Sequence, residues 1–251
     1  MEKIVIIGTS VAASNICKFI EKYKLYEVAG FAVNKEYKTM DTYLGKPVYE
    51  VESLDQVVDK QRDCLFVAIQ WNRLNADRRR VYEQLKGEGY RFANLISPHA
   101  SINGTLAGDN CWITDFVCID TDAVIGSDVF VKVGALVGDH AQVSDHCFIG
   151  AKSTVGGGVQ VGEQSFIGLG AIVFDDTKVG KKCIVGAATA LKRNLPDFCV
   201  YKTASDNFVV KEYAEDEIEQ KLLFRKNVRT PLGRPGGGKI LTFHEINLKA
   251  A

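Results

Sequence analysis

The stretch LVGDHAQVSDHCFIG, residues 136–150, carries the side chains that are the first candidates for chemistry. His140 and His146 lie six positions apart in it, and an aspartate, Asp139 or Asp145, precedes each. An imidazole can bind a metal ion or move a proton, because its charge changes near neutral pH. The pair could therefore be metal ligands, a catalytic base with a neighbour, or one repeat position that carries histidine twice.

A period of six residues surrounds the two histidines. From Ile113 to Leu191 every sixth residue is a branched aliphatic, often followed by glycine, and the residue two before it is small or β-branched. Such a period excludes a helix, which turns once in about 3.6 residues. The small column suits an interior too narrow for large side chains, and we expect Cys111, Cys147 and Cys183 to be core filler in it. The glycines would supply backbone freedom at corners between short strands.

Composition excludes several classes of protein. The chain has 251 residues and a formal net charge of zero, which argues against binding nucleic acid through phosphate neutralisation. No apolar run is long enough to span a bilayer, and the N-terminus reads as a strand without a cleavage site. The seven cysteines show no CxxC spacing, which favours reduced thiols and a cytoplasmic protein.

The first hundred residues alternate strands with helices, which predicts a parallel sheet in a Rossmann-like half domain. Strands are expected at 3–8, 27–33, 63–69 and 90–97, and helices at 8–23, 53–60 and 76–89. The turn after the first strand lacks two of the three glycines of the dinucleotide fingerprint, which argues against NAD.

The ends of these strands hold the candidate ligands for a substrate. Thr9 and Ser10 could bind a phosphate or sugar oxygen at a helix N-terminus, or Ser10 could simply cap the helix. Asn34 and Gln70 follow the next two strands. Trp71 could stack on a base or sugar, or pack under the loop 36–46.

The order of a Rossmann-like half and then a hexad ladder resembles a family of sugar acyltransferases. That family includes sialic acid O-acetyltransferases and N-acetyltransferases of nucleotide-linked amino sugars. The stretch GDHAQVSDHCFIGAKSTVGGGVQVGEQSFIGLGAIV is similar to its catalytic coils. The resemblance implies a left-handed parallel β-helix, with three hexads per triangular coil and the aliphatics pointing inward. We divide the chain into a substrate domain at 1–98, an acyltransferase domain at 99–205, and an extension at 206–251.

The resemblance also implies a mechanism and an assembly. The chain would be a homotrimer with its active sites between neighbouring β-helices, and acetyl-CoA would be the acyl donor. His140 would be the general base, and Asp139, or a carboxylate from elsewhere, would orient its ring. In the family the histidine usually lies two residues after the aliphatic, whereas His140 lies three after Val137. The spacing is instead similar to a sub-branch that reads aliphatic-Gly-His-His, with Asp139 at the first histidine.

Further residues are assigned to acetyl-CoA by the same resemblance. Gly157 would offer a backbone N–H to the thioester oxygen, and Leu169 and Ala187 would contact the pantetheine. Lys192 and Arg193 would meet phosphates or form an ordinary solvated pair. His146, on the next face of the triangle, could contact CoA across a trimer groove.

The preferred function is N-acetylation of a nucleotide-linked amino sugar in surface glycan or lipopolysaccharide biosynthesis. Members that bind uridine nucleotides tend to have an Asp pair after the second strand. This chain has Val33 and Asn34 there, which argues against a binding site for uracil or ribose at that point. The alternatives are O-acetylation of a sialic-acid-like sugar, a non-catalytic scaffold, and a metal-dependent hydratase. No metal is expected, because His99 and His244 lie far from the pair in sequence. Residues 212–226 could form a helix, with Ile218, Leu222 and Phe224 on one side, as a cap or an arm.

Overall fold

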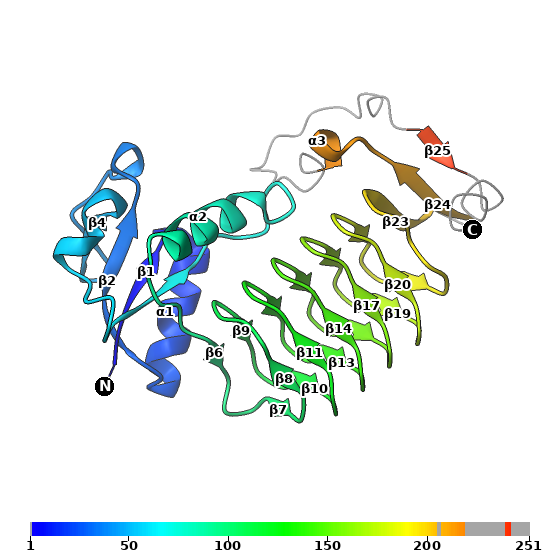
Figure 1. The fold of residues 1–251 in the computed structure, drawn as a ribbon, viewed down its shortest axis with the longest axis horizontal. Helices are drawn as coiled ribbons and strands as arrows, with labels where there is room; N and C mark the ends of the chain where they lie inside the picture. The colour runs from blue at the N-terminus through cyan, green and yellow to red at the C-terminus, as the bar shows by residue number, and fades with distance from the viewer. Residues whose placement is uncertain (1, 205–206, 219–238, 242–251) are drawn as a thin grey trace.

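The computed structural model describes residues 2–204, 207–218 and 239–241. It places an α/β domain at one end of an elongated β-helix, as Figure 1 shows. None of the helices within these ranges is both long enough and apolar enough to cross a membrane.

The N-terminal domain contains a sheet with strand order β3-β4-β2-β1-β5, parallel except for the β3–β4 hairpin. The strands are β1 (Lys3–Ile7), β2 (Glu27–Val33), β3 (Thr42–Tyr43), β4 (Lys46–Glu50) and β5 (Cys64–Val67). The helices are α1 (Val11–Tyr23) and α2 (Ala76–Gly87), with 3₁₀ turns η1 (Lys35–Tyr37) and η2 (Val51–Gln56). The sequence predicted β1, β2, β5, α1 and α2, but it missed β3 and β4.

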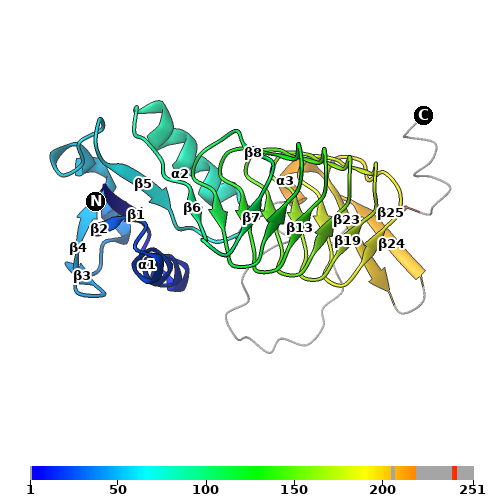
Figure 2. The ribbon, with the colours of Figure 1, turned by 90° about the horizontal axis from the view of Figure 1, so that it is seen from below.

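The two helices cover opposite faces of this sheet, as Figure 2 shows. Alternate side chains of β1 explain the arrangement: Ile4 and Ile6 pack with Ile16 and Ile20 of α1, whereas Val5 and Ile7 pack with residues of α2. A strand buried on both faces reads as a continuous apolar run, as KIVII does.

The run YRFANLIS is not one strand. Phe92 makes an isolated bridge to Leu65 of the sheet, and β6 (Leu95–Ile96) pairs with β9 (Trp112–Ile113) of the β-helix. The first coil therefore begins near residue 95, a few residues before the predicted boundary at 98. The predicted helix at 53–60 is the shorter turn η2.

The β-helix is a three-sided prism of two-residue strands. The aromatic face contains β6, β9 (Trp112–Ile113), β12 (Phe130–Val131), β15 (Phe148–Ile149), β18 (Phe166–Ile167) and β21 (Ile184–Val185). The open face contains β7 (Ser101–Ile102), β10 (Cys118–Ile119), β13 (Leu136–Val137), β16 (Thr154–Val155), β19 (Ile172–Val173) and β22 (Ala190–Leu191). The polar face contains β8 (Thr105–Leu106), β11 (Val124–Ile125), β14 (Gln142–Val143), β17 (Gln160–Val161) and β20 (Lys178–Val179).

The inward ladder is confirmed. The strands pair in parallel with a step of one coil, for example Val137 with Val155, and every aliphatic of the ladder is at most 3% exposed. The small column is buried with it. Cys147 lies in that column, donates its Sγ–H to the Gly162 carbonyl, and has its pKa raised by burial to about 12, as expected of core filler.

The reason we gave for the glycines is wrong. Glycines that directly follow the aliphatics, such as Gly168, are not among the residues with positive φ. The next coil approaches them closely instead: a Cβ on Gly168 would lie 2.5 Å from the amide nitrogen of Ala187. Left-handed backbone occurs two residues later, where most side chains are not glycine, as at His140 with φ 56°.

These left-handed residues form one column along each edge of the prism, and we name the edges by them. The open corner, between the open and polar faces, carries Asp122, His140, Gly158 and Asp176. The covered corner, between the polar and aromatic faces, carries Asn110, Asp128, His146, Gln164 and Lys182. The third corner carries Phe116, Gly134, Lys152, Gly170 and Ala188.

The N-terminal domain covers the aromatic face. Phe66 stacks on Phe130 with ring centroids 5.8 Å apart, and Phe19 of α1 meets Trp112 edge-on at 5.8 Å. Beside this contact, Tyr23 of α1 donates its hydroxyl to Asp115 next to the third corner at 2.8 Å. The two domains therefore share one hydrophobic core along this face.

The C-terminal residues extend the aromatic face. Strand β23 (Cys199–Ala204) pairs with β21 and then antiparallel with β24 (Asn207–Glu212), which pairs with β25 (Lys239–Leu241). Helix α3 (Glu215–Ile218) buries Ile218 against Leu74 and Ile184. Of the helix predicted over 212–226, Leu222 and Phe224 lie outside the described residues, as does His244.

Candidate functional site

His140 lies in solvent on the turn between β13 and β14, and 65% of its side chain is exposed. Its Nδ1 lies 3.7 Å from Oδ2 of Asp122, one coil earlier, which is within ion-pair range but too long for a hydrogen bond. Asp139 instead lies against the next coil, where a Cβ on Gly157 would be 2.6 Å from Asp139 Oδ1. In the part of the chain that the structure describes, the carboxylate next to the imidazole is therefore that of Asp122. The sequence had left open such a carboxylate in place of Asp139.

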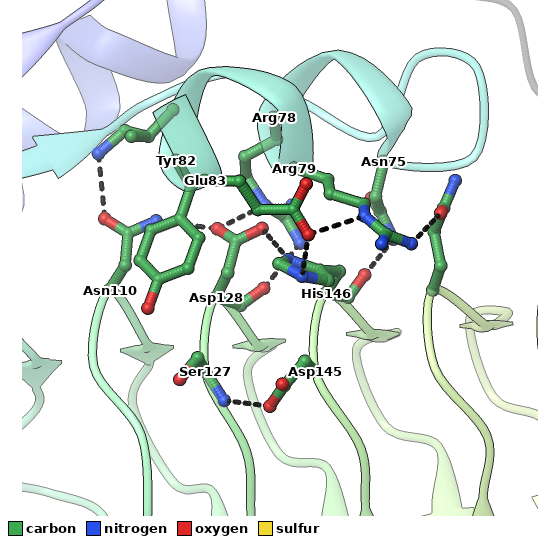
Figure 3. A network of polar contacts seen from close by, with 12 residues as sticks. Asn75, Arg78, Arg79, Tyr82, Glu83, Asn110, Ser127, Asp128, Asp145 and His146 are labelled. Atoms are coloured by element: carbon green, nitrogen blue, oxygen red, sulfur yellow. Dashed lines mark hydrogen bonds and ion pairs between the residues drawn. The ribbon is translucent and has the colours of Figure 1, made fainter. Parts of the chain in front are cut away.

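His146 is buried under α2, with only 4% of the residue exposed. Its Nδ1 lies 3.0 Å from Oδ2 of Asp128, and its Nε2 lies 3.5 Å from Oε1 of Glu83 on α2. Figure 3 shows the ring between these two carboxylates. Both ring nitrogens thus face acids of the same chain, and this enclosure argues against the expected contact with CoA.

A buried ion pair holds α2 on the covered corner. The side chains of Arg78 and Asp128 are fully buried, and Arg78 Nε donates to Asp128 Oδ1 at 2.9 Å. Arg78 Nη2 also donates to the Asp128 carbonyl, and its guanidinium lies 3.9 Å from the centre of the Phe130 ring. Asn110 donates to the same carboxylate at 2.6 Å, and Asn75, just before α2, donates to the His146 carbonyl at 2.7 Å. This network, drawn in Figure 3, fixes the N-terminal domain on the middle coils.

The remaining residues assigned to CoA fall on two different edges of the prism. Gly157 lies one coil beyond His140, and its N–H already donates to Oδ1 of Asp175 at 2.9 Å. Lys192 and Arg193 are exposed at the end of the same edge, beyond β22. The thioester role of Gly157 would require this N–H to leave Asp175 or to be shared with it.

Leu169 and Ala187 lie instead beside the third corner, across the open face from His140. Leu169 is 59% exposed, and Ala187 is also exposed. One chain therefore does not bring the predicted pantetheine contacts to the predicted base. They can meet only if a second copy lays its third corner next to this copy's open corner.

The open face has the character of a contact surface. Its outward residues include Leu136 and Ile172, and the latter is 44% exposed. Phe174 at one edge is 44% exposed and Phe116 at the other is 69% exposed. Most outward residues of the polar face, such as Gln142 and Lys178, are hydrophilic, and Val124 is the exposed apolar exception. Exposed apolar residues gathered on one face of a protein mark a site of association.

The predicted substrate residues gather at the carboxyl edge of the N-terminal sheet, since β2, β1 and β5 are neighbours. Thr9 and Ser10 lie in the loop after β1, and Ser10 is the N-cap of α1 but makes no side-chain capping bond. Asn34 and Gln70 follow β2 and β5. Trp71 packs on Phe148 of the aromatic face, with ring centroids 4.7 Å apart.

Sequence reasoning missed three residues that the structure brings to these places. Arg78 belongs to the run RRR, where only its helical phase distinguishes it from its neighbours. Asp122 precedes His140 by one coil, so a search at a spacing of 18 residues would have found it. Glu52 reaches Asn34 from η2, and no spacing in the sequence indicates that contact.

Metal chemistry finds no support in the positions of the side chains. Within residues 2–204, 207–218 and 239–241, no group of three His, Cys, Asp or Glu residues is placed to hold a metal ion. His99, for example, lies between the rings of Tyr23 and Phe116 at the third corner, whereas His146 lies at the covered corner.

No protein-family model and no curated protein matches this chain. Solved structures do match it. A mutant of perosamine N-acetyltransferase from Caulobacter crescentus, in complex with CoA and GDP-perosamine, is 27% identical with a TM-score of 0.73. The match covers 83% of this chain and 97% of that one.

Two further structures show the fold. The acetyltransferase domain of PglB from Neisseria gonorrhoeae is 20% identical over 80% of this chain and 96% of that one, with a TM-score of 0.70. WeeI from Acinetobacter baumannii is 17% identical over 83% and 100%, with a TM-score of 0.69. The predicted fold class and the predicted resemblance are both confirmed: over both domains, the chain is similar in structure to sugar N-acetyltransferases of the hexapeptide-repeat type.

Proposed function

We propose that this protein transfers an acetyl group from acetyl-CoA to the amine of a nucleotide-linked amino sugar. The observation that carries the proposal is the likeness, over both domains, to an enzyme crystallised with CoA and GDP-perosamine. Such a likeness in the β-helix alone would point only to acyl transfer. Its extension into the N-terminal domain supports an acceptor that carries a nucleotide.

His140 is the group we assign to proton transfer. The acceptor nitrogen attacks the thioester carbonyl and must lose a proton, while the CoA sulfur leaves and must gain one. An imidazole at the surface of a subunit can take the first proton without special tuning, because it titrates near neutrality. Asp122 beside Nδ1 would stabilise the imidazolium, and Asp139 remains a proposed part of the same corner.

The active unit in this proposal is a homotrimer. The exposed apolar residues of the open face would be buried between copies. Their removal from water would stabilise the assembly by about 25 cal/mol per Å² of apolar surface buried. Each copy's open corner, with His140 and Gly157, would then lie beside the third corner of the next, with Leu169 and Ala187. Lys192 and Arg193 would meet the phosphates of CoA at the end of this groove.

The N-terminal domain would hold the nucleotide end of the acceptor at its carboxyl edge. In open α/β sheets ligands bind outside the carboxyl ends of the strands, where Thr9, Ser10, Asn34 and Gln70 lie. Trp71 would close the inner side of that site against the β-helix. We place the reaction in the cytoplasm, in the synthesis of a surface glycan such as lipopolysaccharide.

The test is an acetyl-transfer assay with purified protein, acetyl-CoA and a panel of GDP- and UDP-linked sugars. The panel pairs each amino sugar with the matching hydroxy sugar, and release of the CoA thiol is followed together with product mass. We expect CoA release with an amino sugar and a product that carries one N-acetyl group. Transfer only to hydroxyls would favour O-acetylation of a sialic-acid-like sugar. No transfer to any acceptor would favour a scaffold, and a metal-dependent dehydration would favour a hydratase.

A further inference from the structure

A carboxylate lies at the end of β2 although Asn34, the residue that directly follows the strand, is not an acid. Asn34 directly follows β2, and its Nδ2 donates to Oε1 of Glu52 at 3.3 Å. The backbone N–H of Lys35 donates to Oε2 of the same side chain at 3.0 Å. Glu52 belongs to η2 and is brought there because β4 runs parallel to β2, with Glu50 opposite Val33.

The Glu52 carboxylate is ionised and held in place. Its own backbone N–H lowers its pKa below the ordinary value, and the Lys35 N–H and the Asn34 amide lower it further. Glu52 is exposed, so the remaining acceptor capacity of the carboxylate faces solvent. A carboxylate has about four acceptor sites, and these three donors leave room for a hydroxyl.

The position is the one at which a sheet of this type reads a ribose. In doubly wound sheets a carboxylate near the end of the second strand accepts a hydrogen bond from a ribose hydroxyl. The phosphates then lie at the N-terminus of the helix after the first strand, which here is α1 with Ser10 as its N-cap. Strands β1 and β2 are neighbours, so Glu52 and the start of α1 share one edge.

We propose that Glu52 binds a ribose hydroxyl of a nucleoside diphosphate acceptor, and that Asn34 positions its carboxylate. This inference rests on the proposed function, because it assumes an acceptor that carries a nucleotide. It removes the doubt raised by the missing acid after β2, since η2 supplies the acid from 18 residues further along the chain.

The experiment is isothermal titration of the full-length protein with GDP and UDP and with their 2′-deoxy and 3′-deoxy analogues. The variants are Glu52→Gln and Asn34→Ala, and the matched control is Asp55→Asn, an exposed acid of the same turn. A hydrogen bond to a charged group contributes about 10- to 100-fold in affinity. We expect the wild type to prefer the ribonucleotide over one deoxy analogue by about this factor, and Glu52→Gln to lose the preference. Asn34→Ala should reduce it, and the control should keep it.

Each outcome decides between the inference and its premise. Equal affinity of the wild type for ribo and deoxy compounds, or an unchanged preference in Glu52→Gln, would overturn the role of Glu52 and leave the proposed function standing. If Glu52→Gln lost the discrimination between GDP and UDP, and the wild type bound the deoxy analogues as tightly as the ribonucleotides, Glu52 would contact the base. That result would also overturn its role at the ribose. A wild type that binds neither GDP nor UDP would remove the nucleotide acceptor itself, and the ribose contact with it.

Discussion

The open corner and the covered corner have the same backbone and opposite surroundings. His140 and His146 both have φ near 60° and both follow an aspartate in the same phase of the repeat. One side chain is 65% exposed, and the other is 5% exposed with a carboxylate at each ring nitrogen. The repeat thus fixes the turn, whereas the domain packed on the turn decides what the histidine can do.

The difference teaches where an imidazole of this chain is free to react. His146 would have to break contacts with Asp128 and Glu83 before it could reach another molecule. Among the described residues, His140 has one exposed acid, Asp122, within ion-pair range, and it flanks the apolar open face on which a second copy would pack. The proposed chemistry therefore belongs to the open corner, whereas the covered corner holds the two domains together.

Loss of the base at the open corner should produce the largest effect. His140→Asn keeps a residue that tolerates left-handed backbone but has no titrating group. We expect kcat of acetyl transfer to fall by about 10²–10⁴-fold, the usual contribution of general-base catalysis. The free energy of unfolding in urea should stay within about 0.5 kcal/mol of the wild type, as for other exposed positions. An unchanged kcat would remove His140 from the mechanism.

The next effect concerns the ion pair of the covered corner. Arg78→Met leaves the Asp128 carboxylate buried without its cation, and breaking such a pair costs about 3–5 kcal/mol. Urea unfolding should report this loss, while Arg80→Met, an exposed change two positions further along α2, should cost less than about 0.5 kcal/mol.

A second substitution makes this prediction stricter. Adding Asp128→Asn to Arg78→Met removes the stranded charge and keeps the left-handed turn, so it should recover part of the loss. If the double variant were less stable than Arg78→Met by the full cost of a separate substitution, the two side chains would act independently.

The sequence was sufficient for the ladder because a fully buried column repeats at every coil. Val137 and Val155 could be placed inward from the period together with the family resemblance it supports, and β1 from a continuous apolar run. It was not sufficient to decide which corner is covered, because that depends on one arginine of α2 meeting one aspartate 50 residues away. Glycines were assigned correctly to corners for the wrong physical reason. Gly168 is needed for the close approach of the next coil and not for a left-handed turn.

The same limit applies to the substrate edge. Asn34 and Ser10 could be placed at the strand ends from the alternation of strands and helices. Glu52 could not, since β4 was not expected and its pairing with β2 brings Glu52 there. A contact between separate elements has no periodic signal, so it appears only when the packing is known.

The smallest effect in this series belongs to the buried histidine. His146→Asn can offer its side-chain amide to Asp128 in place of Nδ1, but it removes the rest of the ring, with Nε2 beside Glu83 and the edge contact with Tyr82. We expect a loss of about 1–3 kcal/mol in the free energy of unfolding, the usual size for a substitution that removes buried contacts. The value of kcat, measured where the variant is fully folded, should equal that of the wild type.

Combining the two histidine variants tests the separation of the corners directly. If the open corner carries chemistry and the covered corner carries stability, the double variant should show the kcat of His140→Asn and the unfolding free energy of His146→Asn. Distant sites that share no partner add within about 0.5 kcal/mol, and the ion-pair contacts of the two rings described above have no residue in common. A fall in kcat for His146→Asn as large as that for His140→Asn, at unchanged stability, would transfer the reaction to the covered corner and reverse the comparison.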